Sequence, residues 1–298
     1  MDGIYIVNKP KGITSFDVVA KMRRICETKK VGHAGTLDPD AVGVLPICVG
    51  RATKVIEYLM EEDKAYHVEL MLGMATDTQD SSGSVLYEKP VTASITEIEE
   101  TIKSFVGESM QIPPMYSAIR VNGKRLYELA RKGLEVERNP RAITISQIDI
   151  SSINKKDDKV IVLFDVDCSK GTYVRTLCND IGERLNCGGH MTSLTRTRSG
   201  PFKLEDSFTL EALEHLKKGN DLHSAKLSID TAVLYMPQVY VKDKEAKNLK
   251  NGQTIQMENL QTGLSRVYHE NGAFLAIGKT VLQNNRQALK THKWIDIT

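Results

Sequence analysis

The chain is most distinctive at Gly32-His33-Ala34-Gly35-Thr36-Leu37-Asp38-Pro39. Glycine lets a backbone turn tightly, and proline fixes its own φ and biases the preceding Asp38 toward an extended conformation. A rigid loop that holds a carboxylate near a histidine can present a nucleophile, although an ordinary Asx turn uses the same residue types. Asp40 follows two residues later, so the chemistry alone leaves Asp38 and Asp40 as alternatives.

Strand and helix signals flank this loop on its N-terminal side. Residues 5–7 read as a short strand, and Thr14 with Asp17 forms a capping box that predicts a helix start. The apolar face expected for this helix consists of Phe16, Val19, Met22 and Ile25.

After the loop, strand and helix patterns continue without a regular βαβ order. Residues 66–72 alternate as a strand with one apolar face, and residues 160–166 read as a buried strand. A second capping box, Ser94 with Glu97, begins a helix. The apolar positions expected on its inner face are Ile95, Ile98, Ile102 and Phe105. This mixture predicts an α+β fold.

Two regions carry clustered positive charge. Residues 117–141 hold seven Lys or Arg against three Asp or Glu, and residues 238–298 hold nine against five. Each excess is either a solvated surface or the footprint of a phosphate-backbone partner. Residues 111–141 read as an insertion in a domain of residues 1–235, followed by a small β-rich domain at 238–298.

Composition narrows the function classes. No apolar run is long enough for a membrane span, and the N-terminus does not have the pattern of a signal peptide. The five cysteines form no CxxC pair, so we expect a reduced, cytoplasmic protein with no metal site.

Two further residues are candidates for chemistry. By periodicity, Tyr66 is a core-facing tyrosine on its strand. Arg175 lies in the first turn of a helix predicted after Gly171. A positive charge there is unfavourable for the helix dipole, so this arginine is either a surface residue or one retained for another purpose.

Five blocks in this order resemble the TruB-type pseudouridine synthases, which isomerise the T-arm uridine of tRNA. These blocks are Lys9-Pro10, the Asp38 loop, the Tyr66 strand, the insertion at Tyr116 and the Arg175 helix. The resemblance implies a pseudouridine synthase fold, with a central mixed, largely antiparallel sheet flanked by helices. It also implies a small β-rich PUA-like C-terminal domain that binds RNA.

The resemblance also implies roles for individual residues. Asp38 is the expected catalytic aspartate, Tyr66 stacks on the target uracil, and Arg175 holds Asp38. His33 fills the gap left by the flipped base, Leu194 lines the base pocket, and Lys9 supports the loop. The full set expected to contact substrate or RNA is His33, Lys9, Leu194, Tyr173, Arg120, Lys124, Arg125, Arg131 and Lys132.

The expected activity is conversion of uridine 55 of tRNA to pseudouridine, without cofactor or metal, by a monomer that needs no protein partner or membrane. Three alternatives remain. The chain could be an RNA-folding helper, a guide-RNA-dependent relative, or a nucleosidase that uses the same carboxylate. The complete basic insertion favours stand-alone recognition of tRNA over the last two.

Overall fold

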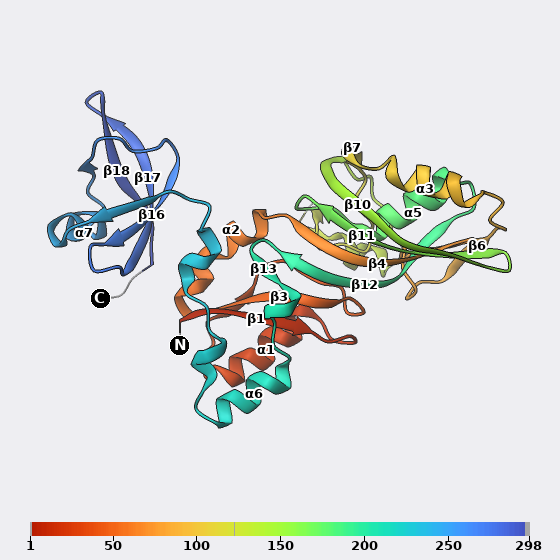
Figure 1. Cartoon of the computed structure of the whole chain (residues 1–298), viewed down its shortest axis with the longest axis horizontal. Coiled ribbons are helices and arrows are strands. Elements are labelled where there is room, and N and C mark those ends of the chain that lie inside the picture. The colour runs from red at the N-terminus through yellow and green to blue at the C-terminus, as the bar shows by residue number, and fades with distance from the viewer. Residues whose placement is uncertain (1, 122, 296–298) are drawn as a thin grey trace. The chain divides into compact units, whose positions relative to one another are not determined.

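The computed structural model describes residues 2–121 and 123–295. It divides into two compact units, which are described separately (Figure 1). The first unit comprises Met1–Asp38, Val44–Glu61 and Gly200–Thr298, and the second comprises Pro39–Gly43 and Glu62–Ser199. Within the described residues, none of the helices has the length and apolar character needed to cross a membrane.

The first unit is built on strand β1 (Gly3–Lys9) and its neighbour β3 (Val42–Val49). Short β2 (Val31–His33) pairs antiparallel with β3. Side chains alternate between the two faces, as the period of two requires. Ile4 and Ile6 enter one apolar cluster, and Tyr5 and Val7 enter another. The strand expected at residues 5–7 is therefore confirmed.

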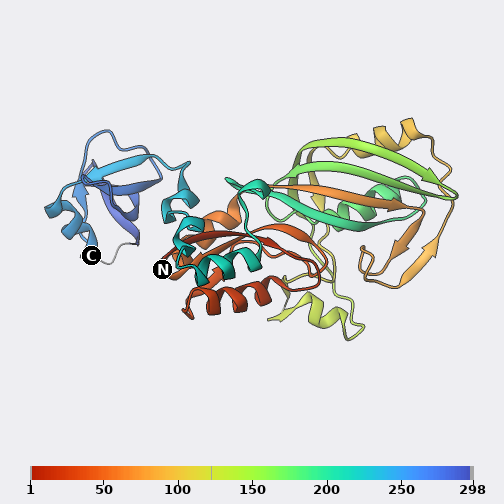
Figure 2. The same cartoon turned by 60° about the horizontal axis from the view of Figure 1, so that its bottom comes forward.

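Helices cover both faces of these strands. Helices α1 (Ser15–Ile25) and α6 (Leu210–Lys218) pack together on the Tyr5 side (Figure 2). The opposite cluster contains residues of α2 (Ile56–Glu61) and of two 3₁₀ helices, η1 (Gly50–Val55) and η4 (Ile229–Val233). Further short elements of this unit are β13 (Phe202–Lys203), η2 (Leu204–Asp206) and η3 (Leu222–Ala225).

The start of α1 follows the sequence pattern, but one residue of its expected apolar face does not. The Thr14 side chain accepts the Asp17 backbone N–H, and Asp17 accepts the Thr14 N–H in return, which completes the capping box. Phe16, however, is 62% exposed. Its ring lies under the Arg23 guanidinium, 5.5 Å from the ring centroid. Val18 occupies the buried position instead, because the inner stripe is rotated by part of a turn.

The C-terminal part of the first unit forms a separate five-stranded sheet in the order β14-β16-β17-β18-β15. Only β14 and β16 are parallel to each other. Helix α7 (Asp243–Lys250) contributes Leu249 to the core of this sheet. The strands are β14 (Gln238–Val241), β15 (Ile255–Gln256), β16 (Leu264–His269), β17 (Phe274–Gln283) and β18 (Arg286–Trp294). The expected β-rich C-terminal region is confirmed.

The second unit contains a sheet in the order β12-β4-β11-β10-β7, with antiparallel neighbours throughout. The first two residues of β3, Val42 and Gly43, add a parallel pairing at β12. The sheet is therefore mixed and largely antiparallel, as expected. Its strands are β4 (Lys64–Leu72), β7 (Gly107–Gln111), β10 (Arg141–Lys156), β11 (Lys159–Cys168) and β12 (Gly189–Ser199).

Helices α3 (Ile95–Lys103) and α5 (Val174–Arg184) belong to this unit (Figure 1). The Ser94–Glu97 capping box begins α3 as predicted. Ile98 and Ile102 are buried, but Ile95, the first residue of α3, is 54% exposed. A hairpin of β5 (Met74–Thr76) and β6 (Val85–Glu88) precedes α3.

The insertion leaves the sheet at the end of β7 and returns at the start of β10, where Gln111 and Arg141 are paired. It contains a small hairpin of β8 (Arg120–Val121) and β9 (Lys124–Arg125), followed by helix α4 (Leu126–Ala130). Leu126 is buried, whereas most charged residues of the insertion are exposed. The segment between β7 and β10 thus lies outside the sheet and exposes most of its charged side chains.

Candidate active site

The Asp38 loop is held by a side chain that the sequence pattern did not single out. The buried Ser15 hydroxyl accepts the Leu37 backbone N–H at 2.9 Å and donates to the Leu37 carbonyl at 3.1 Å. Both backbone polar groups of the residue before Asp38 are thus satisfied by one serine at the start of α1. Asp38 itself is half-buried. This geometry fixes the backbone that carries the carboxylate.

Lys9 supports the same region from the other end. Its side chain is fully buried, and its ammonium group donates to the carbonyls of Pro10 at 2.9 Å and Ile13 at 2.7 Å. Those bonds fix the turn that leads into the α1 cap and therefore into Ser15. The geometry favours the loop-supporting role of Lys9 over direct contact with RNA.

His33 is the last residue of β2, where it is paired with Ile47 of β3. Its side chain is half-buried. Ala34, the next residue, donates its backbone N–H to the Pro46 carbonyl at 2.9 Å. Gly35 then takes a φ of +98°, a region that favours glycine. His33 is therefore presented from a strand end, directly before the turn that leads to Asp38.

The chain beyond Asp38 is confined by a glycine in the second unit. Gly43 has a φ of +104°, and a Cβ there would lie 2.3 Å from the Arg196 carbonyl oxygen. Only glycine allows β3 to approach β12 this closely. Within the second unit, this position therefore requires glycine.

Arg175 is a buried residue in the first turn of α5, not a surface arginine. One terminal nitrogen donates to the Asp80 carboxylate at 3.5 Å, and the other donates to the Tyr116 carbonyl at 2.7 Å. The guanidinium carbon also lies 6.0 Å from the centroid of the Tyr173 ring. The structure therefore brings Arg175 and Tyr173 together and adds Asp80 to them.

Asp80 is the centre of an ordered turn. Its side-chain Oδ1 accepts the Thr78 hydroxyl at 2.7 Å, the Ser82 N–H at 2.9 Å and the Ser82 hydroxyl at 2.6 Å. These bonds orient the other oxygen, Oδ2, toward Arg175. A carboxylate held in this way keeps the opposing guanidinium in one place.

Tyr66 lies on β4, opposite Val166 of β11 and Arg196 of β12. It is 9% exposed and shares a buried face with Val68. Leu194 of β12 is paired with Val68 and is 8% exposed. Tyr66 and Leu194 are thus brought onto neighbouring strands. Each retains a small accessible surface, which distinguishes them from the fully covered Val68.

Buried positive charge lies close to Tyr66. Lys64 and Arg196 are both almost covered. Burial, with the nearby Arg196 charge as a second cause, lowers the pKa of Lys64 to about 8. Arg198 forms an ion pair with Asp167 on the adjacent part of the sheet. This end of β4 therefore carries two buried basic side chains, Lys64 and Arg196, beside Tyr66.

The basic residues expected in the insertion lie on its surface. Tyr127 of α4 has two of them near its ring, with guanidinium carbons at 5.9 Å for Arg125 and 5.5 Å for Arg131. All five side chains are exposed, namely those of Arg120, Lys124, Arg125, Arg131 and Lys132. Exposed Lys and Arg side chains of this kind suit contacts with phosphates.

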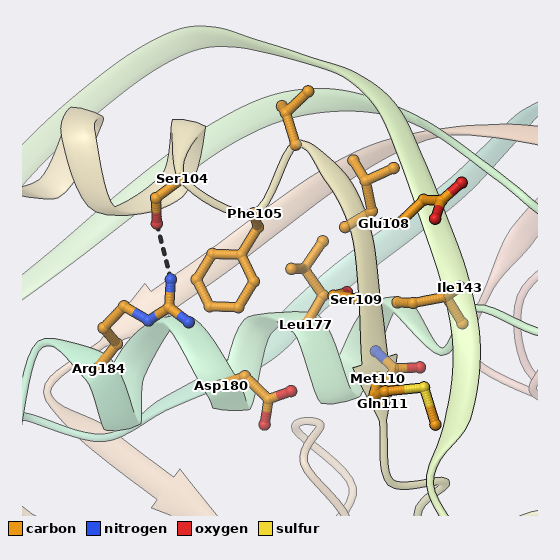
Figure 3. Close-up of a pocket in the computed structure, with 12 residues that line it drawn as sticks. Ser104, Phe105, Glu108, Ser109, Met110, Gln111, Ile143, Leu177, Asp180 and Arg184 are labelled. Carbon is orange, nitrogen blue, oxygen red and sulfur yellow. Dashed lines mark hydrogen bonds between the residues drawn. The ribbon is translucent and has the colours of Figure 1, made fainter.

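A cavity of about 210 Å³ lies beside the end of α3, strand β7 and helix α5 (Figure 3). Phe105, Leu177 and Ile143 form apolar parts of its wall, and Asp180 and Arg184 project from α5. The residues predicted for the site do not line it. Across residues 2–121 and 123–295, His, Cys, Asp and Glu form no group of three suited to a metal ion.

Sequence reasoning missed Ser15, Asp80 and Gln111, a buried residue whose side chain bonds Tyr173. Their partners are 22, 95 and 62 positions away in the chain. Ser15 lies inside the capping box of Thr14 and Asp17, which was the available signal for it. A single sequence gives no register for such distant pairs.

Comparison with known families matches three models along the chain. Residues 23–174 match "TruB family pseudouridylate synthase (N terminal domain)" and residues 175–234 match "tRNA pseudouridylate synthase B C-terminal domain". Residues 237–284 match "Pseudouridine synthase II TruB, C-terminal". Together the matches extend from residue 23 to residue 284, with only residues 235 and 236 between them unmatched.

Relatives match over nearly their full length. A tRNA pseudouridine synthase B of Clostridium kluyveri is 51% identical, over 93% of this chain and 95% of that protein. Its counterpart in Bacillus subtilis is 44% identical, over 93% and 92%.

Solved structures agree with this assignment. A chain from an H/ACA RNP bound to a substrate RNA that contains 2′-deoxyuridine has a TM-score of 0.74 and 26% identity. That match covers 99% of this chain and 85% of the other. A chain from a Cbf5-Nop10-Gar1 complex gives the same values. The expected fold is confirmed, and this chain belongs to the TruB family of pseudouridine synthases.

Proposed function

We propose that this chain converts uridine 55 in the T-arm of tRNA to pseudouridine. The observation that carries the proposal is the Asp38 loop, whose backbone Ser15 clamps at Leu37, in a chain of the TruB family. The relatives named tRNA pseudouridine synthase B match it over most of their length, which supports tRNA as the substrate.

The reaction moves a base on its sugar without changing its composition. The N1–C1′ bond breaks and a C5–C1′ bond forms, while the hydrogen of C5 leaves as a proton and N1 regains a proton. No redox step and no net water are needed. Asp38 is the proposed catalytic residue, because a carboxylate can stabilise or trap the fragment while the glycosidic bond is broken.

The proposed positions of the other residues follow from their geometry. Tyr66, with its small accessible surface on β4, stacks on the extruded uracil, an interaction worth about 1–3 kcal/mol per base. Leu194, on the neighbouring strand, lines the base pocket. His33 replaces the flipped nucleotide in the RNA stack and so offsets part of the cost of extrusion, about a few kcal/mol.

Arg175 has the proposed role of holding the Asp38 carboxylate ionised and oriented, because a guanidinium remains charged and can bond a carboxylate through two nitrogens. Its bond to Asp80 supports this role. Asp80 would fix the position of the guanidinium during the reaction. Tyr173 beside Arg175 is proposed to contact the RNA.

The exposed Arg120, Lys124, Arg125, Arg131 and Lys132 are proposed to contact phosphates of the T-arm. Residues 1–235 act in this proposal as the catalytic domain, and residues 238–298 as an RNA-binding domain. The protein acts as a monomer without a protein partner. We place the activity in the cytoplasm, in keeping with the five cysteines, which are buried free thiols.

The test is tritium release from a T-arm stem-loop that carries 5-tritiated uridine. Wild-type protein and Asp40→Asn should release tritium at similar rates, whereas Asp38→Asn should bind the RNA but release none. Equal loss in both variants, or release by Asp38→Asn at the wild-type rate, would remove the assignment of Asp38. RNA binding without release by wild-type protein would instead favour an RNA-folding helper or a guide-dependent enzyme.

A further inference from the structure

Gln111 occupies the point where the insertion leaves the sheet. It is the last residue of β7, is paired with Arg141 at the start of β10, and is 4% exposed. Figure 3 shows its side chain at the end of β7, where this strand passes α5. A buried amide group needs hydrogen-bond partners.

Both hydrogen-bonding groups of the Gln111 side-chain amide bond the backbone of Tyr173. Its Oε1 accepts the Tyr173 N–H at 2.8 Å, and its Nε2 donates to the Tyr173 carbonyl at 3.1 Å. Tyr173 is the N-cap of α5, and its carbonyl also accepts the Leu177 N–H that closes the first turn. Gln111 therefore holds the N-cap of α5 by two reciprocal bonds.

A second bond joins the same two elements. Arg175, two residues into the same helix turn, donates to the carbonyl of Tyr116 in the insertion at 2.7 Å. Thr176, the next residue of α5, donates its hydroxyl to Gln79 at 2.7 Å. The first turn of α5 is thus held by side-chain bonds on both sides, with Gln111 and Arg175 linking it to the insertion.

We propose that Gln111 is a positioning residue that fixes the N-terminal turn of α5, and with it Arg175, to the base of the RNA-binding insertion. The inference rests on the proposed function for the role of Arg175. The backbone of Gln111 is paired with β10 where the insertion begins, and its side chain bonds the N-cap residue of α5. A displacement of the insertion at this point would therefore also displace the N-cap of α5. Gln111 then keeps a constant position of the Arg175 guanidinium relative to the RNA that the insertion binds.

The proposal predicts a split between catalysis and binding. Gln111→Met keeps the length of the side chain but removes both bonds. We expect the single-turnover rate of tritium release to fall about 10- to 100-fold, since displacements near 1 Å are known to have effects of this size. The dissociation constant for the T-arm RNA should change less than about threefold, because the phosphate contacts of the insertion remain.

Gln147→Met serves as the matched control. Gln147 lies exposed on β10, and its amide bonds only a side chain nearby, that of Asp149 at 2.6 Å. Gln111→Glu is the second variant. Its carboxylate still accepts the Tyr173 N–H, but its second oxygen then faces the Tyr173 carbonyl oxygen in a buried site. Because this contact is repulsive, the rate of Gln111→Glu should fall at least as far as that of Gln111→Met.

Amide hydrogen exchange gives a readout that does not depend on catalysis. In Gln111→Met, the backbone amides of residues 173–178 and of residues 112–121 should both exchange faster than in wild-type protein. In Gln147→Met, the exchange rates of the same two segments should equal those of wild-type protein. If wild-type protein releases no tritium but amide exchange is still faster in Gln111→Met, the proposed function is wrong, while the link between the insertion and the N-cap of α5 is supported. If Gln111→Met releases tritium at the wild-type rate with unchanged exchange, or loses only RNA affinity, the inference is overturned.

Discussion

Ser15→Ala is the sharpest test of how the fold presents Asp38. The substitution removes the hydroxyl that bonds both the N–H and the carbonyl of Leu37. Alanine remains compatible with the helix that begins there. Any effect on the reaction must therefore pass through the backbone that leads into Asp38.

The expected size follows from the two lost bonds. Each buried polar group left without a partner costs about 1–3 kcal/mol, and Ser15 is 2% exposed. Two such groups would cost about 2–6 kcal/mol if the loop stayed in place. We expect the loop to shift instead, which lowers the single-turnover rate about 10- to 100-fold and the free energy of unfolding by about 1–3 kcal/mol.

The assay combines tritium release under single-turnover conditions with urea unfolding. Thr209→Ala is the control, because it removes the side-chain cap of α6 in the same unit, at a cost of about 1 kcal/mol. The free energy of unfolding of Thr209→Ala should fall, while its rate of tritium release should equal that of wild-type protein. A wild-type rate in Ser15→Ala, despite the expected loss of stability, would refute a positioning role for this clamp.

Three other outcomes follow from the structure. Gly43→Ala should lower the free energy of unfolding by more than about 3 kcal/mol in urea melts, since its Cβ would meet the Arg196 carbonyl; Gly12→Ala, at φ +86° with open space, should lose only about 1 kcal/mol. Equal losses would contradict this. Asp80→Asn should slow tritium release about 10-fold or more, an effect of about 1.4 kcal/mol or more, whereas Asp165→Asn, in an exposed pair with His67, should not; unchanged turnover in Asp80→Asn would exclude its role. Lys64 binds its proton less tightly when folded, since its pKa is lowered from 10.5 to about 8. Between these pH values the unfolded chain therefore binds more protons at Lys64 than the folded chain, so this residue makes the free energy of unfolding rise with pH. Lys64→Met should show a smaller rise in the free energy of unfolding, measured by urea melts, from pH 7.5 to 9.5. The same rise in Lys64→Met as in wild-type protein would contradict the lowered pKa of Lys64.

Local signals in the sequence predicted elements well where one short segment determines them. The capping boxes at Thr14 and Ser94 formed as expected, and the alternating 66–72 strand has its apolar face buried. Phe16 and Ile95 were wrong as buried positions. Each lies in the first turn of its helix and satisfies the 3.6-residue period, but its side chain is more than half exposed.

The candidate site was predictable only in part. The motif positions Asp38, Tyr66 and Arg175 could be selected by resemblance, and their roles remain predictions. Burial of Arg175 and its bond to Asp80 depend on contacts 95 residues apart in the chain, and the Gln111 bond to Tyr173 spans 62. Such contacts are determined by strand register and helix placement, which no local pattern in a single sequence specifies.

The central claim is tested most directly by mapping pseudouridine in a full-length, unmodified tRNA transcript. The transcript would be incubated with wild-type protein or with Asp38→Asn, treated with a carbodiimide that marks pseudouridine, and read by reverse transcription. We expect a single stop that reports position 55 with wild-type protein and none with Asp38→Asn. A stop at another uridine, no stop with wild-type protein, or an equal stop with Asp38→Asn would contradict it.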